Sequence, residues 1–292
     1  VSDIGILGFL KKRFPEKELH LSTQANCVNT EAAKIYYDMG IKRIVLGREL
    51  SLKEIEAVKN NVPGLEIEVF AHGAMCLAYS GRCFLSKYLA DRSANQGDCA
   101  HSCRWQYRVL EESERPGEYF PVVQGENFTS ILSSKDLCMI HHLQELKDAG
   151  VDSIKIEGRM KSIYYTAVIT RAYRKQLDYI EGISDEDPKP YVDEIFNVSH
   201  REFSTGFYYG RDEIEMPTFK SYMTEAKFLG SIEEKISDNV YRLDVKNQIT
   251  TKDNIEYIGP DLLYMATKLP STSPANAGRF DFSLWESALT KK

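Results

Sequence analysis

The sequence predicts an α/β protein with a parallel sheet, and three observations support this fold class. Short β-branched segments alternate with amphipathic helical segments over about the first 180 residues. The expected strands end near Ser22, Gly47 and Ala71, so they recur at the spacing of one strand–helix unit. Hydrophobic residues make up 42% of the 292 residues, which is enough to form the core of one large domain or of two unequal ones.

The first part of the chain contains three expected strands and two expected helices. In order they are a strand at 19–22, a helix at 31–39 capped by Thr30 and ended by Gly40, a strand at 42–46, a helix that Ser51 caps and that runs to Lys59, and a strand at 66–70. A helix at 136–149, a strand at 151–156 and a helix at 163–180 follow later. A complete (β/α)8 barrel needs about 250 residues. Because only five strands can be counted, either the sheet is open or its first strands are missing.

The composition changes after residue 182, which predicts a second unit. Residues 183–199 form an acidic, proline-containing linker with a short helix, and residues 200–292 carry glycines between short β-type segments such as 240–245. We therefore expect an α/β domain over 1–182, a linker over 183–199 and a small β-rich domain over 200–292.

The charge balance narrows the classes of partner. The chain has 37 Lys and Arg against 43 Asp and Glu, and this net charge of -6 gives no overall attraction to nucleic acid or to an anionic membrane. Any RNA contact must then come from a local basic patch. The chain also shows neither an apolar segment long enough to span a membrane nor a secretory signal. We expect a cytoplasmic protein that acts without a membrane or DNA partner.

Polar residues follow several of the expected strands. They are Asp3, Thr23, Gln24, Arg48, Glu49, His72, Glu157 and Arg159. Ligands bind at the carboxyl ends of parallel strands, so these residues predict a polar pocket on one rim of the sheet. We expect His72, Glu157 and Arg159 to be catalytic there, and Gln24 and Arg48 to bind substrate. A helix cap or an ion pair at the rim explains any single one of them equally well.

Four of the six cysteines lie within a short stretch, which indicates metal or redox chemistry. Cys76, Cys83, Cys99 and Cys103 are separated by six, fifteen and three residues. Structural zinc favours pairs of short cysteine knuckles, and only the last pair has that spacing. A [4Fe-4S] cluster tolerates the longer first spacing, because its irons can be reached from different loop segments. The spacing therefore favours a cluster over zinc, with buried thiols that bind no metal as the third possibility.

Two further cysteines lie outside this stretch. Cys138 falls in the first turn of the expected helix at 136–149, where the helix dipole lowers the pKa of a thiol. It is the alternative to Cys103 as the fourth ligand. Cys27 is more simply explained as a small buried hydrophobic residue.

The expected helix at 163–180 carries a group of basic residues beside tyrosines. Arg171, Arg174 and Lys175 offer positive charge for RNA phosphates, while Lys161, Tyr164 and Tyr165 lie close to the Glu157 turn. The alternative is the solvated basic face of an ordinary amphipathic helix.

A long segment, EVFAHGAMCLAYSGRCFLS at 68–86, resembles the signature of the U32 peptidase, or collagenase-like protease, family. Shorter stretches agree with it at 22–24, 46–50, 97–105, 134–137, 155–159 and 203–207. The resemblance covers roughly residues 1–210, and its motifs are closest to the branch that hydroxylates the wobble uridine of tRNA.

The resemblance implies a partial TIM-barrel-like (β/α) catalytic domain that begins upstream of Val1, followed by a small β domain. It also implies an oxygen-independent hydroxylase, since relatives hydroxylate a tRNA uridine, a ribosomal RNA cytidine or the ubiquinone ring. Their cysteines hold a [4Fe-4S] cluster, and prephenate is linked to the RNA enzymes as the source of the hydroxyl group. Arg48 and Arg159 are the expected partners of such a carboxylate.

Three functions remain open, and hydroxylation of a tRNA wobble uridine ranks first. A U32 collagenase-like peptidase ranks second, because the chain has neither a Gly-x-Ser-x-Gly elbow nor a His-Glu-x-x-His helix. A non-catalytic RNA-binding scaffold ranks third. A cluster bound only by cysteine passes electrons, which leaves acid–base chemistry to His72 or Glu157.

Overall fold

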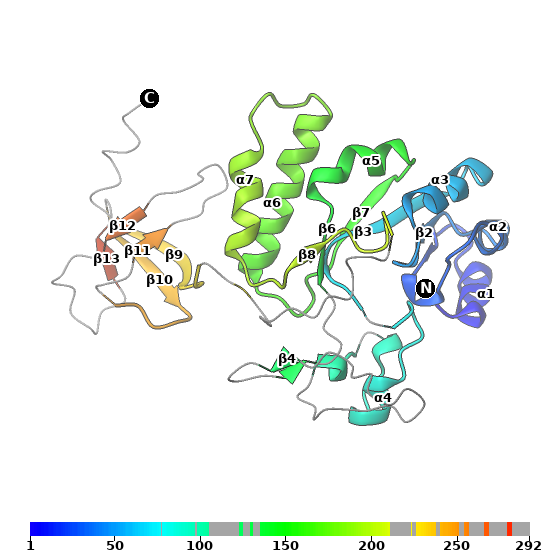
Figure 1. Ribbon diagram of the computed structural model, residues 1–292, viewed down its shortest axis with the longest axis horizontal. Helices are drawn as coiled ribbons and strands as arrows, with labels where there is room; N and C mark the ends of the chain where they lie inside the picture. The colour runs from blue at the N-terminus through cyan, green and yellow to red at the C-terminus, as the bar shows by residue number, and fades with distance from the viewer. Residues whose placement is uncertain are drawn as a thin grey trace.

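The computed structural model describes residues 1–76, 78–96, 98–104, 123–124, 129–130, 135–210, 223, 226–237, 240–250, 254–256, 266–268 and 279–281. Figure 1 shows helices on both sides of a central sheet, with α1, α2 and α3 beside β2 and β3, and with α6 and α7 on the other side. Helix α4 lies apart from these, below the strand ends in this view.

The central sheet is mostly parallel. Its strand order is β1 (His20–Leu21), β2 (Arg43–Val45), β3 (Glu66–Ala74), β6 (Asp136–Cys138) and β8 (Phe203–Ser204), and β7 (Ser153–Ile156) also pairs with β3. Four of these pairings are parallel, whereas β3 and β6 run antiparallel. The α/β fold class predicted from the sequence is therefore confirmed. Strands β6 and β8 are parallel to each other but run opposite to the other four strands, which was not expected.

Helices α1, α2, α3 and α6 each begin after a residue whose side chain caps them. The described residues form α1 (Ile4–Arg13), α2 (Thr30–Asp38), α3 (Leu52–Asn61), α4 (Leu85–Ala90), α5 (Leu143–Asp148), α6 (Ile163–Ile180) and α7 (Lys189–Asp193). Ser51 caps α3 as predicted, in a reciprocal capping box with Glu54. The cap of α2 is Asn29 rather than Thr30, because the Asn29 side chain accepts the Ala32 N–H at 2.8 Å.

The helix predicted at 136–149 is a correction. Residues 136–138 form strand β6, a 3-10 turn follows at Ile140–His142, and only then does α5 begin. The reason is a buried ion pair. The Asp136 carboxylate accepts from the Arg201 Nε at 3.0 Å and from its Nη2 at 2.5 Å, and the two side chains are 2% and 1% exposed. This contact holds residue 136 in the sheet beside β8.

The hydrophobic core lies between the sheet and its helices. Ile44 of β2 and Ile67 of β3 are fully buried. Helix α6 buries one face through Tyr165, Val168, Ile169, Ala172 and Tyr173, which recur at the spacing of one side of a helix. The helix predicted at 163–180 is thus confirmed at both of its ends.

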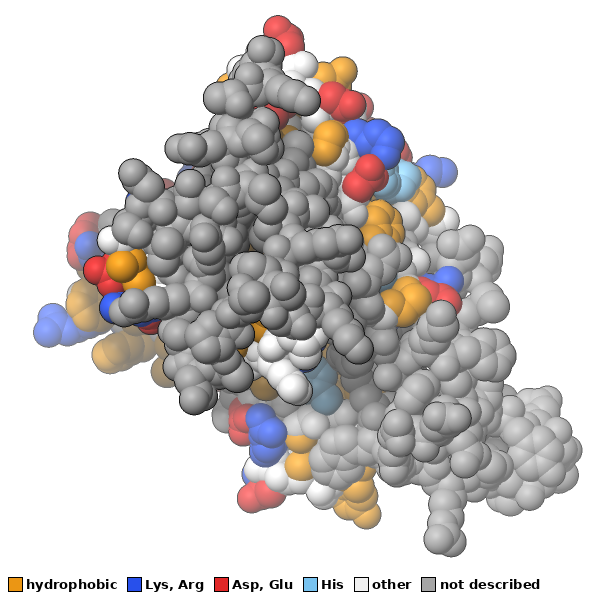
Figure 2. All heavy atoms as spheres, turned by 90° about the vertical axis from the view of Figure 1, so that its left-hand side faces the viewer, with side chains coloured by type: hydrophobic (Ala, Val, Ile, Leu, Met, Phe, Trp, Pro, Cys, Tyr) orange, Lys and Arg blue, Asp and Glu red, His pale blue; other side chains and the backbone are white. Residues whose placement is uncertain are grey.

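The C-terminal part of the chain is described only in pieces. There, strands β9 (Gly230–Ser237), β10 (Val240–Val245) and β13 (Arg279–Asp281) form an antiparallel sheet, and β11 (Asn254–Glu256) pairs with β12 (Ala266–Lys268). Earlier in the chain, β4 (Val123–Gln124) pairs with β5 (Thr129–Ser130). The domain boundaries at 182 and 199 stay predictions. On the side of the molecule that carries β9 and β10, Figure 2 shows acidic and basic side chains interspersed among the described residues.

Among the described residues, no helix is both long enough and apolar enough to cross a bilayer.

Candidate active site

A cavity of about 930 Å³ opens at the carboxyl ends of the parallel strands. Gln24 lines it after β1, Arg48 after β2, Cys76 after β3, and Glu157 and Arg159 after β7. These ends meet on one rim because the strands run in the same direction. Thr23 also lines the cavity, so the structure brings together five of the polar residues that the sequence placed at strand ends, and it adds the first cysteine.

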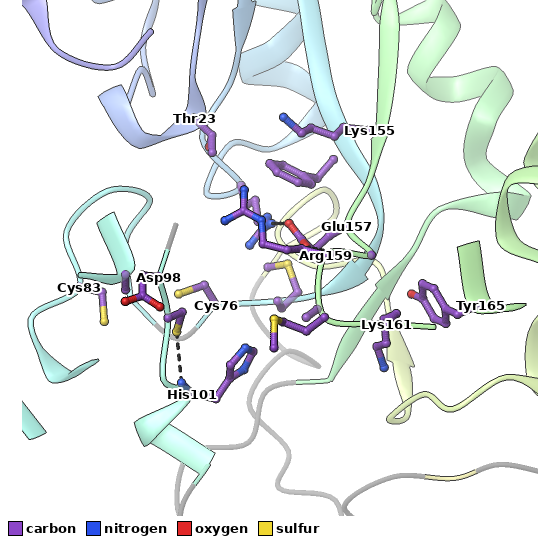
Figure 3. A pocket seen from close by; sticks show the side chains of 18 of the residues that line it. Thr23, Cys76, Cys83, Asp98, His101, Lys155, Glu157, Arg159, Lys161 and Tyr165 are labelled. Carbon is purple, nitrogen blue, oxygen red and sulfur yellow. Dashed lines mark hydrogen bonds and ion pairs between the residues drawn. The ribbon is translucent and has the colours of Figure 1, made fainter. Parts of the chain in front are cut away.

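All four clustered cysteines line this cavity. Cys76 follows β3 directly, whereas Cys83, Cys99 and Cys103 come from the segment around α4. Burial raises the pKa of the Cys76 thiol, and the charges of Cys83 and Cys99 raise it further, while Arg48 and the Ala78 N–H lower it. In Figure 3 the thiols of Cys76 and Cys83 lie on one side of the cavity, with Glu157 and Arg159 toward its middle.

The four thiols are soft sulfur donors, which zinc and iron–sulfur clusters both take as ligands. Among the described residues, no three His, Cys, Asp or Glu side chains are gathered closely enough to hold one metal ion. A single zinc needs all its ligands within about 2.3 Å of one point. A [4Fe-4S] cluster is held by four thiolates spread around a larger body. Thiolates are ligands of both zinc and a [4Fe-4S] cluster, and the choice between the two stays a prediction.

Cys138 lies elsewhere. It is in strand β6, where it pairs with His72 across the sheet, and it does not line the cavity. Burial raises the pKa of the Cys138 thiol to about 11, and its hydrogen bonds to the Ile140 N–H and the Tyr173 side chain only partly offset this. The expected lowering by a helix dipole is wrong, because this residue belongs to a strand.

One wall of the cavity carries a charged group around Glu157. The Arg48 guanidinium stacks on the Phe70 ring at 3.8 Å and lies 4.0 Å from the Glu157 carboxylate. Burial lowers the pKa of Arg48, and the nearby charges of Cys76 and Glu157 act in the opposite direction. The Arg159 N–H donates to the Glu157 Oε1 at 3.0 Å, which orients this carboxylate.

A glycine allows the close approach of β3 to the Glu157 turn. Gly73 has a φ of +108°, and a Cβ added there would lie 2.3 Å from the Glu157 carbonyl oxygen. A side chain at this position would push the Glu157 turn away from β3. The conformation of Gly73 thus helps to place the carboxylate at the cavity.

The cavity is positively charged although the whole chain is acidic. Six basic side chains line it against two acidic ones, namely Arg48, Arg92, Lys155, Arg159, Lys161 and Lys227 against Asp98 and Glu157. The net charge of the chain is -6. Basic residues are therefore concentrated at this site, which suits an anionic ligand.

His72 does not join this group. Its side chain is 1% exposed and does not line the cavity, and its Nδ1 lies 3.3 Å from the Tyr173 hydroxyl. Burial lowers the pKa of His72 to about 3, against the raising effect of the Asp136 charge. The imidazole is therefore neutral and enclosed, and its Nε2 has no hydrogen-bond partner among the described residues.

The three basic residues predicted to bind substrate from α6 form ion pairs within the protein. Arg171 pairs with the buried Glu194, Arg174 with Asp178 at 2.7 Å, and Lys175 with Glu186 at 2.6 Å. None of the three lines the cavity. The acidic partners lie 23, 4 and 11 positions later in the sequence. A search for basic patches counts the basic residues alone and does not pair them with these carboxylates.

Several cavity residues were missed by reasoning from the sequence. They are His101, Lys155, Lys227 and Phe228. The signal for His101 was its position between Cys99 and Cys103, and Lys155 precedes the Glu157 turn by two residues. No local signal marks Lys227 or Phe228, because they reach the cavity from the C-terminal part of the chain.

Comparison with known proteins places the chain in a family. The model of Peptidase family U32 matches residues 1–218. The chain is 35% identical to tRNA hydroxylation protein P of Escherichia coli (strain K12) over 89% of this chain and 66% of that protein. It is 43% identical to the 23S rRNA 5-hydroxycytidine C2501 synthase of the same strain, over 60% of this chain and 25% of that protein. It is 37% identical to the collagenase of Porphyromonas gingivalis (strain ATCC BAA-308 / W83), over 66% of this chain and 48% of that protein.

The extent of these matches differs. The chain spans just under two thirds of the length of the tRNA hydroxylation protein, and that match extends past residue 218, since it covers 89% of the chain. The matches to the ribosomal RNA enzyme and to the collagenase are short enough to fit within the first 218 residues. No solved structure matches the chain. The family match over 1–218, which includes the strand ends and all four cavity cysteines, shows that the chain belongs to peptidase family U32.

Proposed function

We propose that this chain is part of an iron–sulfur-dependent, oxygen-independent RNA hydroxylase that converts the wobble uridine of tRNA to 5-hydroxyuridine. The observation that carries the proposal is a cavity at the strand ends that four thiols, the Glu157 carboxylate and an excess of basic side chains line together. An anionic substrate, a redox group and an acid–base group are the three requirements of such a reaction. The similarity to tRNA hydroxylation protein P supports tRNA as the substrate.

The four thiols of Cys76, Cys83, Cys99 and Cys103 are the proposed ligands of a [4Fe-4S] cluster. When bound, the cluster supplies electron transfer at the wall of the cavity. The spacing of these cysteines in the sequence supports a cluster over zinc, because only Cys99 and Cys103 form a short knuckle. Cys103, which lines the cavity, is the proposed fourth ligand in preference to Cys138.

The protein's own residues bind and orient the substrates. Glu157 is the proposed acid–base residue, since its carboxylate lies in the cavity and is held by Arg48 and by the Arg159 N–H. His72 is left out of this step because it is enclosed behind the wall. Arg48 and Arg159 are the proposed partners of a small carboxylate co-substrate, with prephenate as the source of the hydroxyl group.

The proposal includes the architecture around this site. The strand-end position of the cavity supports a TIM-barrel-like catalytic domain, of which this chain carries a part. The antiparallel strands β9, β10 and β13 support a small C-terminal β-rich domain that contributes to the cavity through residues 226–228.

The decisive experiment measures the modified nucleosides of tRNA. Cells that lack the gene should lose 5-hydroxyuridine and its derivatives at the wobble position, as measured by nucleoside mass spectrometry. The wild-type gene should restore them, and the Glu157→Gln variant should not. Retention of these nucleosides in the deletion strain would overturn the proposal.

The cluster has its own test. Anaerobically purified protein should contain about four irons and four sulfides per chain, and Cys99→Ser should lose both. Cys27→Ala is the matched control, because Cys27 is a fully buried core residue that does not line the cavity. Stoichiometric zinc without iron or sulfide would contradict the cluster.

Peptidase activity is the second candidate, and the similarity to a collagenase favours it. Its chemical difficulty is the nucleophile, which would have to come from cysteines that are the proposed cluster ligands. Cleavage of a collagen-like peptide by metal-free protein, together with unchanged wobble uridine, would place peptidase activity first. RNA binding without loss of any modified nucleoside would favour the non-catalytic scaffold.

A further inference from the structure

An aromatic pair joins two distant segments at the cavity. The rings of Tyr164 and Phe228 are stacked, with their centroids 5.3 Å apart and their planes 18° from parallel. Both residues line the cavity. Tyr164 is in the first turn of α6, whereas Phe228 lies just before β9 and beyond residue 218, where the family match ends.

Two lysines that are close in sequence to this aromatic pair also line the cavity. Lys227 is exposed, lines the cavity and has no ion-pair partner among the described residues. Lys161 donates to the Ser199 carbonyl oxygen at 2.8 Å, and its ammonium group lies 5.0 Å from the Tyr165 ring. In Figure 3 Lys161 and Tyr165 lie across the cavity from Cys83 and Asp98. This end of the cavity is therefore aromatic and cationic, and it is separate from the sulfur end.

The chemistry of this end points to a nucleic acid. Stacked aromatic rings beside cationic side chains are the elements that hold an unpaired base and its phosphate. The two acidic residues of the cavity are accounted for elsewhere, since Asp98 pairs with Arg92 and Glu157 faces Arg48. A core contact would bury both rings and exclude charge, but Phe228 is only half-buried and its neighbour Lys227 is in solvent.

We propose that Tyr164, Phe228 and Lys227 form a subsite that stacks an unpaired base of single-stranded RNA and contacts its phosphate, next to the reacting nucleotide. This subsite rests on the proposed RNA hydroxylase function. Phe228 and Lys227 lie outside the family match, in a segment that family members with other substrates need not share. These two residues therefore contribute to the selection of RNA as the substrate.

The test is a double-mutant cycle between protein and RNA. The probe is a fluorescent stem-loop RNA with an unmodified uridine at the wobble position, compared with versions in which one loop nucleotide at a time is abasic. Phe228→Ala and Tyr164→Ala should each weaken binding of the intact loop about 5- to 100-fold. One abasic position should weaken wild-type binding by a similar factor and should cause no further loss in Phe228→Ala.

Control variants separate stacking from folding. Phe228→Trp should restore affinity, since it keeps an aromatic face. Tyr179→Ala is the matched control for Tyr164→Ala, because Tyr179 is an exposed tyrosine at the far end of the same helix. Lys227→Gln should reduce the slope of log affinity against log salt by about 0.7, as expected for one lost phosphate contact with a single strand.

The outcomes distinguish this subsite from the proposed function. If Phe228→Ala binds the stem-loop as wild type does while wobble hydroxylation persists in cells, the subsite is refuted and the function stands. Losses that are additive at every abasic position would also refute stacking. If the wild-type chain binds no RNA and instead binds a collagen-like peptide at Tyr164 and Phe228, both proposals fall.

Discussion

The buried ion pair between Asp136 and Arg201 allows a quantitative prediction about stability. Replacing Asp136 by Leu leaves the Arg201 guanidinium buried without its partner, which costs about 3–5 kcal/mol of unfolding free energy. The double variant Asp136→Leu, Arg201→Met removes both charges and should lose less. It still leaves the Arg201 N–H without the Asp136 Oδ2 that accepts it at 3.1 Å, so about 1–3 kcal/mol of the loss remains.

The same pair sets part of the acid sensitivity. Burial alone would raise the pKa of Asp136, but the charge and hydrogen bonds of Arg201 outweigh it and hold this pKa below its ordinary value. The unfolded chain has an Asp pKa of about 3.9. A carboxylate with a lowered folded pKa stabilises the protein fully above about pH 4, and this stabilisation is lost as the pH falls further. Asp136→Leu should abolish this part of the pH dependence.

Urea denaturation followed by far-UV circular dichroism measures these differences. With a urea m-value of about 2 kcal/mol/M, the single variant should lower the midpoint by about 1.5–2.5 M, and the double variant by less. The exposed pair Lys189–Asp193 provides the control, since breaking it should leave the midpoint almost unchanged. If the double variant is less stable than Asp136→Leu alone, the argument from buried charge is refuted.

Three further predictions follow from the surroundings of the cavity. Gly73→Ala should destabilise the protein by about 1–3 kcal/mol in thermal unfolding, because the added Cβ meets the Glu157 carbonyl oxygen, whereas Gly182→Ala, at a φ of +66° with open space around it, should cost less. Cys138 should resist iodoacetamide at pH 8 until the protein unfolds, because a pKa of about 11 leaves roughly one thiol in a thousand as thiolate, and fast labelling detected by mass spectrometry would contradict its burial. His72 should stay neutral in an NMR titration from pH 8 to pH 5. Since its folded pKa of about 3 lies below the unfolded value of about 6.5, its contribution to stability is complete above about pH 6.5 and declines as the pH falls toward 3, and a midpoint near 6.5 in the folded protein would refute this.

The elements that local signals define were predicted well. Strands ending near Ser22 and Gly47 were visible because β-branched segments and helix caps repeat along the chain. The positions of Gln24, Arg48 and Glu157 on one rim then followed from the direction of parallel strands. These inferences need only neighbouring residues and the geometry of a strand–helix unit.

The errors came from contacts between distant residues. The segment from Asp136 has a helical pattern, but Arg201, 65 positions later, holds it in the sheet. Arg171 has the spacing of a surface residue, yet Glu194 comes from a later helical turn to pair with it. Phe228 reaches the cavity from beyond residue 218, where the family match ends. Periodicity within a window of sequence cannot detect such partners.

The contrast between a positive cavity and an acidic chain has a consequence for encounter rates. A polyanion far from the molecule meets the field of a net charge of -6, whereas one at the cavity mouth meets an excess of basic groups. Ionic screening acts over about 8 Å at physiological salt, so the repulsion is damped first and the local attraction persists at contact. For the proposed RNA substrate, these charges predict little nonspecific retention on the rest of the surface. They also predict selection by fit at short range rather than by long-range attraction.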